Sequence, residues 1–182
     1  PGLVTVDPDD VDPSTSIGGL KLEIPIILSA MDSAVSPQTA ILAGKLGSLG
    51  VLNLEGVQTR YENPDVILEK IANVSVEEYV EFMQKVYLEP VKEELVVKRL
   101  KEIKDAGVFT VGSVTPQAAE RLLPLVQQAG ADAILIQSTV VSTQHKTSKG
   151  KPLDLKAFCK KSKISVWVGN CVTYEVALDF MN

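Results

Sequence analysis

Residues 23–56 read EIPIILSAMDSAVSPQTAILAGKLGSLGVLNLEG, and this stretch decides the fold. The apolar run at residues 24–28 predicts a strand buried on both faces, as in a parallel sheet. Ser36 predicts the start of a helix, with Pro37 at the first helical position, which proline favours. A second apolar run at residues 51–54 predicts the next strand. The stretch is therefore a strand, a polar loop, a helix and a strand.

The same unit recurs along the chain after an irregular lead-in at residues 1–19 and a short outer strand at 21–23. The first helix is expected to continue to Leu49, because Gly47 and Gly50 stop it. Further strands are predicted at residues 108–111, 133–136 and 164–168, and further helices at 64–71, 76–87, 92–106, 117–129, 153–161 and 174–181. Five strands that alternate with helices predict a parallel α/β fold.

Two parallel architectures fit this pattern. One is an open doubly wound sheet, and the other is a (β/α)8 barrel. The first strand–helix loop lacks G-x-G-x-x-G, which argues against a dinucleotide-binding Rossmann unit. A whole barrel needs about 250 residues, and this chain has 182. The second architecture would therefore be an incomplete TIM barrel of about five β/α units.

Composition excludes several classes of function. The chain is 45% hydrophobic and 23% charged, with a net charge of −5 and scattered Lys and Arg residues, so no nucleic-acid partner is expected. No apolar run reaches 18 residues and no signal peptide is visible, so no membrane partner is expected either. Cys159 and Cys171 lack zinc-site spacing, so we predict no metal site and a cytoplasmic location.

Small and polar residues follow every predicted strand. In both architectures ligands bind at the carboxyl ends of the strands. The clusters are Ser29-Ala30-Met31-Asp32 (the polar tip), Asn53 with Glu55, Gly112-Ser113, Gln137-Ser138-Thr139 and Gly169-Asn170-Cys171. Loops are polar in most proteins, so the pattern alone does not separate a binding site from ordinary loops.

Individual reactive residues carry weaker hypotheses. His145 is the only histidine and could be a general base, but a solvated loop residue is the favoured interpretation. Cys171 could be a nucleophile, but burial under the last helix is favoured. Cys159 is expected in the core. Asp32 and Glu55 could be paired carboxylates.

The stretch IPIILSAMDSAVSPQTAILAGKLGSLGVLNLEGVQTRYENP resembles the IMP dehydrogenase/GMP reductase family, and the resemblance continues through KDAGVFTVGSVTPQAAERLLPLVQQAGADAILIQSTVVS and VWVGNCVTYEVAL. It is most similar to family members without CBS domains. The resemblance implies that residues 1–182 are one domain, the N-terminal portion of a TIM barrel, with no CBS insertion. Family barrels are usually tetramers, so a homo-oligomer is expected.

The resemblance also implies a chemistry and substrate-binding residues. In the family a loop cysteine attacks the purine ring of IMP, hydride passes to NAD, and water releases XMP. Ser29 matches the serine that contacts the nucleotide phosphate, and Met31 matches the methionine that packs on the purine. Gly169 and Asn170 match the pair that faces the purine. The family's nucleophilic cysteine is expected beyond Asn182, so no catalytic residue is assigned and the chain alone is expected to be inactive.

Gln137, Ser138 and Thr139 match the positions that face the nicotinamide ribose of NAD. The family has an acidic residue where Gln137 stands. A carboxylate accepts from both ribose hydroxyls, while an amide has one oxygen, so this contact is expected to differ. Two alternatives to IMP dehydrogenase stay open: a GMP reductase, and a non-catalytic nucleotide-binding or assembly module.

Overall fold

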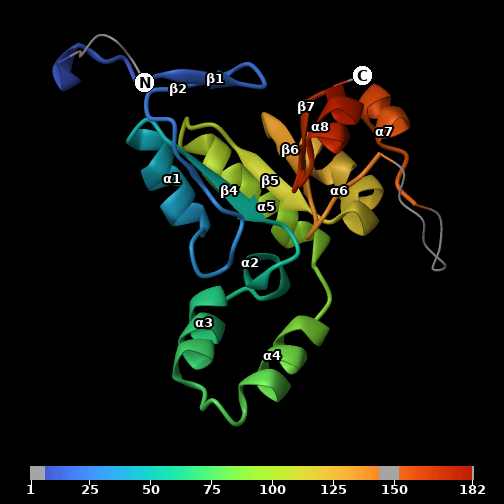
Figure 1. The fold of residues 1–182 in the computed structure, drawn as a ribbon. Coiled ribbons are helices and arrows are strands. Elements are labelled where there is room, and N and C mark those ends of the chain that lie inside the picture. Colours follow the sequence, from blue (N-terminus) through green and yellow to red (C-terminus); the bar gives the residue numbers. More distant parts are fainter. Residues whose placement is uncertain (1–6, 144–151, 182) are drawn as a thin grey trace.

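A five-stranded parallel sheet organises the protein. The structure is a computed structural model and describes residues 7–143 and 152–181. The strands lie in chain order: β3 (Ile27–Leu28), β4 (Leu49–Asn53), β5 (Val111–Val114), β6 (Ala133–Gln137) and β7 (Ser165–Gly169). The sheet curls into half of a barrel, so the predicted incomplete TIM barrel is confirmed (Figure 1).

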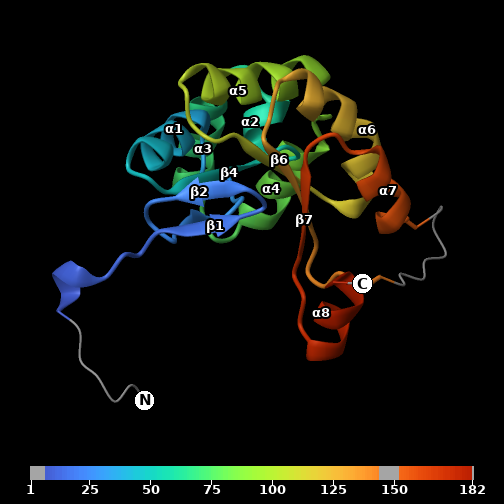
Figure 2. The same ribbon diagram turned by 90° about the horizontal axis from the view of Figure 1, so that it is seen from above.

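Helices cover the convex side of this half-barrel. Figure 2 shows α1 (Pro37–Lys45), α5 (Glu93–Asp105), α6 (Pro116–Gln128) and α7 (Leu155–Lys161) in an arc along it. The core between sheet and helices is fully buried at Leu52, Leu100, Leu122 and Ile134. The remaining helices are α2 (Val57–Arg60), α3 (Pro64–Asn73), α4 (Tyr79–Leu88) and α8 (Tyr174–Met181).

The start of α1 forms as predicted. The Ser36 hydroxyl accepts from Thr39 N at 3.2 Å, and the Thr39 hydroxyl accepts from Ser36 N at 2.7 Å. This reciprocal cap satisfies two amides that have no partner within the helix. The cap fixes the direction in which the chain leaves the polar tip.

A β-hairpin covers the amino ends of the strands on the inner side of the half-barrel. After a short 3-10 helix (η1, Pro8–Asp10), strands β1 (Thr15–Ile17) and β2 (Leu20–Leu22) pair antiparallel. Gly18 and Gly19 form the turn, both with positive φ. Leu20 and Leu22 of the hairpin form a second core with Leu49, Val51 and Val111, and the partly buried Trp167 packs against it. The outer strand was predicted at residues 21–23 and lies one residue earlier. The described part of the lead-in, residues 7–19, was wrongly expected to be irregular, since it contains η1 and β1.

Two boundaries near glycines differ from the prediction. The first helix ends at Lys45, and Leu49 begins β4, because Gly47 at φ 82° turns the chain back toward the sheet. The third strand was expected at residues 108–111, but it forms at Val111–Val114 as β5. Thr110 N donates to Asp132 Oδ2 at 2.8 Å instead of to a neighbouring strand. The residues before Val111 therefore form the loop that connects α5 to β5.

The first predicted strand is shorter and more exposed than expected. Only β3 pairs, and Ile24, Ile26 and Ile27 are 38%, 54% and 42% exposed. Among the described residues β3 has a partner strand on one edge only, β4. The prediction of a strand buried on both faces is therefore wrong for this structure.

Four helices separate β4 from β5. Helices α3 and α4, with the turn between them, project away from the sheet (Figure 1), and we call this segment the α3–α4 hairpin. Helix α3 buries no residue and α4 buries only Val86. In the described ranges no helix has both the length and the apolar character needed to cross a membrane.

Candidate functional site at the carboxyl ends of the strands

The parallel register brings the predicted clusters to one edge of the sheet. Asn53 pairs with Ser113, and Gln137 pairs with Gly169. Gly112 and Ser113 lie inside β5 rather than after it, so Thr115 is the residue that follows this strand. This edge is where parallel α/β folds bind their ligands.

The ends of β6 and β7 form one continuous wall. Ser138 N donates to Gly169 O at 3.0 Å, and Asn170 N donates to Ser138 O at 3.1 Å. The Ser113 hydroxyl lies 3.3 Å from Gln137 Oε1. Gln137 and Ser138 of the predicted cofactor-binding set are thus adjacent to Gly169 and Asn170 of the predicted substrate-binding set.

Hydroxyl groups on this wall remain available to a ligand. The Ser138 and Thr139 hydroxyls have no hydrogen-bond partner within the described part of the chain, and Gln137 keeps its amide N–H groups while Oε1 faces Ser113. A cavity of about 50 Å³ lies beside Ser138, between α6 and α7. One amide donor and two hydroxyls fit the two hydroxyls of a nucleotide ribose.

The polar tip lies across the half-barrel from that wall. Met31 N donates to Ser29 O at 2.7 Å, and Val35 N donates to Met31 O at 2.9 Å, which makes a tight turn. Val35 is buried, whereas Ser29 and Met31 are exposed. Strands β3 and β7 are four steps apart, roughly 19 Å along the sheet at about 4.8 Å per step. A ligand that touches both must lie across the mouth of the half-barrel.

Asp32 anchors the tip to the following loop. Its Oδ2 accepts from Val57 N at 3.0 Å and from the Tyr87 hydroxyl at 2.6 Å. Its Oδ1 is buried with no hydrogen-bond partner among the described residues. Gly56 allows this approach, because a Cβ there would lie 2.6 Å from Asp32 Cγ.

Tyr87 brings the α3–α4 hairpin to this anchor. Burial raises the pKa of the Tyr87 hydroxyl, and the Asp32 carboxylate raises it further, so the group stays protonated as a donor. The Arg60 guanidinium stacks on the ring at 5.4 Å and donates to Glu55 O at 2.9 Å. Arg60 also donates to the carbonyls of Tyr87 and Glu89.

Glu55 joins β4 to the start of α6. Its carboxylate accepts from Thr115 N at 2.5 Å and from the Thr115 hydroxyl at 3.2 Å. A carboxylate at a helix N-terminus is favoured by the helix dipole. Glu55 and Asp32 therefore each bind their own partners, and no hydrogen bond joins the two carboxylates in the described part of the chain.

Both expectations of buried cysteines are wrong. Cys171 is exposed, and its thiol donates to Thr173 O at 3.5 Å. Cys159 is exposed because Phe158 is the residue of α7 that faces the core. His145 lies outside the described residues. Within residues 7–143 and 152–181 no three His, Cys, Asp or Glu side chains gather as metal ligands would.

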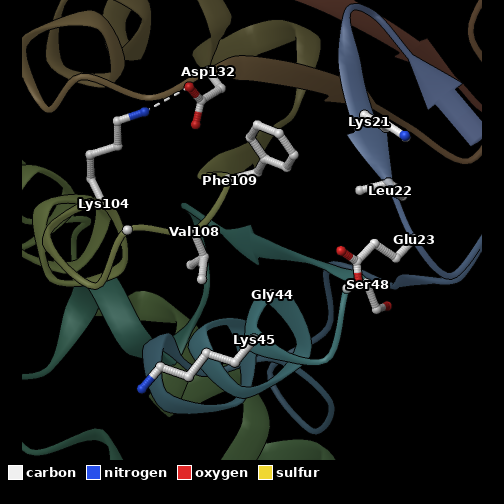
Figure 3. Close-up of a pocket in the computed structure, with 12 residues that line it drawn as sticks. Lys21, Leu22, Glu23, Gly44, Lys45, Ser48, Lys104, Val108, Phe109 and Asp132 are labelled. Carbon is white, nitrogen blue, oxygen red and sulfur yellow. Dashed lines mark hydrogen bonds and ion pairs between the residues drawn. The ribbon is translucent and has the colours of Figure 1, made fainter.

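A second, larger cavity lies at the opposite end of the strands. It has a volume of about 400 Å³ and lies beside the turns that precede β3, β4, β5 and β6. Lys104 and Asp132 form an ion pair at 2.6 Å on one side, and Lys21, Leu22 and Glu23 lie on the other (Figure 3). The predicted site residues lie at the other end of the strands, so this cavity is separate from the candidate site.

Sequence reasoning missed three residues of the site: Arg60, Tyr87 and Thr115. Arg60 lies within the VQTRYENP segment that follows β4, so its place in the sequence was a usable signal. Tyr87 is 55 residues from Asp32, and no pattern in the sequence connects the two. Thr115 was missed because β5 was predicted to end too early.

Fold and site together define a TIM-barrel portion with its polar residues at the carboxyl ends of the strands. The sequence profile of the "IMP dehydrogenase / GMP reductase domain" matches residues 1–182. The chain therefore belongs to the IMP dehydrogenase/GMP reductase family.

Similar proteins agree with this assignment. An uncharacterized oxidoreductase of Mycolicibacterium smegmatis is 32% identical over all of this chain and 50% of its own length. An inosine-5'-monophosphate dehydrogenase of Methanocaldococcus jannaschii is 34% identical over 44% of this chain and 18% of its own. The crystal structure of an IMP dehydrogenase/GMP reductase-like protein from Corynebacterium glutamicum superposes with a TM-score of 0.88 at 30% identity, over 95% of this chain and 46% of that one. The chain spans about half the length of its full-coverage relatives.

Proposed function

We propose that this chain forms one half of the active-site barrel of an NAD-dependent oxidoreductase that converts IMP to XMP. The observation that carries the proposal is the wall in which Gln137, Ser138, Gly169 and Asn170 lie side by side at the sheet edge. Family membership supplies the substrate class. In this proposal residues 1–182 are one barrel portion, and the protein acts in the cytoplasm as a homo-tetramer.

The polar tip and the wall at the ends of β6 and β7 have separate tasks in this proposal. Ser29 and Met31 hold the phosphate and the purine of IMP, and Asn170 donates to the purine from the opposite side. Gln137, Ser138 and Thr139 hold the nicotinamide ribose of NAD. When NAD is bound, its nicotinamide ring accepts the hydride. Because Gln137 contributes an amide donor, the ribose hydroxyls must accept from it and donate to the Ser138 and Thr139 oxygens.

The test is a steady-state assay of the full-length protein that contains this chain. IMP with NAD is expected to yield XMP and NADH, whereas GMP with NADPH would release ammonia in a GMP reductase. Thr139→Val removes one ribose contact and should raise the KM for NAD by about 2- to 10-fold, because a net hydrogen bond is worth about 0.5–1.5 kcal/mol. Thr143→Val, an exposed threonine in the same loop, is the matched control.

Three results would contradict the proposal. They are turnover of GMP with NADPH but not of IMP with NAD, absence of both activities, and a Thr139→Val protein with the NAD KM of the control. Absence of both activities would favour the non-catalytic nucleotide-binding module.

A further inference from the structure

The α3–α4 hairpin is attached to the sheet through the C-terminal end of α4. The Tyr61 hydroxyl donates to Val86 O at 2.9 Å, and Arg60 donates to Tyr87 O at 3.2 Å. Val86 is the one buried side chain of α4, and α3 has none. The rest of the hairpin is therefore largely solvated, and its position is set by residues of the loop after β4.

Tyr87 extends this attachment to the polar tip. Its hydroxyl donates to Asp32 Oδ2 at 2.6 Å, while the ring stays against Arg60. Val57 N donates to the same oxygen, so one carboxylate joins three segments that are distant in sequence. Loss of the Tyr87 hydroxyl would leave Asp32 with one donor.

The hydrogen bonds of Asp32 all involve one oxygen. Oδ1 is buried without a partner among the described residues, so the two donors at Oδ2 hold the carboxylate. Met31 precedes Asp32 directly, and Val35 N donates to Met31 O to close the turn around Asp32. The orientation of the exposed Ser29 and Met31 side chains therefore depends on where Asp32 is held.

From this geometry we infer that Tyr87 is a positioning residue for the nucleotide site. The inference rests on the proposed function, in which the polar tip holds the nucleotide. Tyr87 acts through Asp32 and contacts no reacting atom. A helix that lies outside the barrel thereby sets the affinity of the barrel for its nucleotide.

The test compares Tyr87→Phe with Tyr79→Phe in the full-length protein. Tyr79 lies on the same helix and is 46% exposed, so Tyr79→Phe controls for the loss of a tyrosine hydroxyl on α4. Titration calorimetry with IMP should show binding weakened about 5- to 10-fold in Tyr87→Phe and unchanged in the control. Hydrogen exchange at the amides of Val35 and Val57 should quicken in Tyr87→Phe alone.

A double-mutant cycle separates positioning from simple support of the hairpin. If Tyr87 acts through Asp32, Tyr87→Phe has no further effect on exchange at Val57 in an Asp32→Ala background, which offers neither donor an oxygen. An equal effect in both backgrounds would overturn the inference, as would unchanged exchange in Tyr87→Phe. If no variant binds IMP, the exchange data still decide whether Tyr87 positions the tip, and the proposed function alone fails.

Discussion

Replacement of Gly56 by alanine is the sharpest test of the Asp32 anchor. The added Cβ would lie 2.6 Å from Asp32 Cγ, far inside the roughly 3.5–4.0 Å of carbon–carbon contact. Gly56 has φ −93°, which any residue adopts, so backbone strain does not contribute. The carboxylate must swing away from Val57 N and from the Tyr87 hydroxyl.

The expected magnitude follows from those two hydrogen bonds. Bonds to a charged group contribute about 1.5–3 kcal/mol each, which gives an upper range of roughly 3–6 kcal/mol for both. Asp32 is half-buried and recovers part of this from water. We therefore expect Gly56→Ala to lower the free energy of unfolding by about 2–4 kcal/mol.

Urea denaturation of the full-length protein, followed by circular dichroism, measures this change. Asp32→Ala removes the clash, so the double variant with Gly56→Ala should be about as stable as Asp32→Ala alone. A Gly56→Ala protein within about 0.5 kcal/mol of the wild type would refute the reasoning. So would strict additivity of the two substitutions.

Two further predictions concern the same edge of the sheet. The raised pKa of Tyr87 stabilises the fold fully below the ordinary tyrosine pKa of 10.0, and this contribution is lost as pH rises beyond it. Urea denaturation from about pH 9 to pH 11 should therefore show wild type losing more stability than Tyr87→Phe, and parallel losses would contradict this. Glu55→Ala should cost about 1–2 kcal/mol by uncapping α6, whereas Glu55→Gln, which can still accept from Thr115 N, should cost less than about 1 kcal/mol; equal costs for the two would argue against the cap.

Elements fixed by local chemistry were predictable from the sequence. The cap formed by Ser36 and Thr39 lies within four residues, and the five strands follow from apolar runs of ordinary length. The boundary of β5 was wrong because Thr110 is held by Asp132, which is distant in sequence. Cys159 was placed in the core because it lies in the middle of a predicted helix, but the buried residue of α7 is its neighbour Phe158.

The candidate site shows the same division. Polar residues after strands were visible as candidates, because the fold class implies that such positions meet. Their partners were not visible: Asp32 binds Tyr87 of α4, with three helices between the two residues in the chain, and Glu55 binds the first amide before α6. Such contacts depend on the position of whole elements, which no local pattern encodes.

The order of the strands also sets the order in which the protein can assemble during synthesis. Each strand pairs with its predecessor in the chain, so every new unit finds its partner already made. Between Asn53 and Val111, however, synthesis at about 5–20 residues per second takes roughly 3–12 s. Helices form within about a microsecond, so α2 to α5 can fold while β4 still waits for β5. The free edge of β4 during those seconds is the point at which the nascent chain is most exposed to wrong strand pairing.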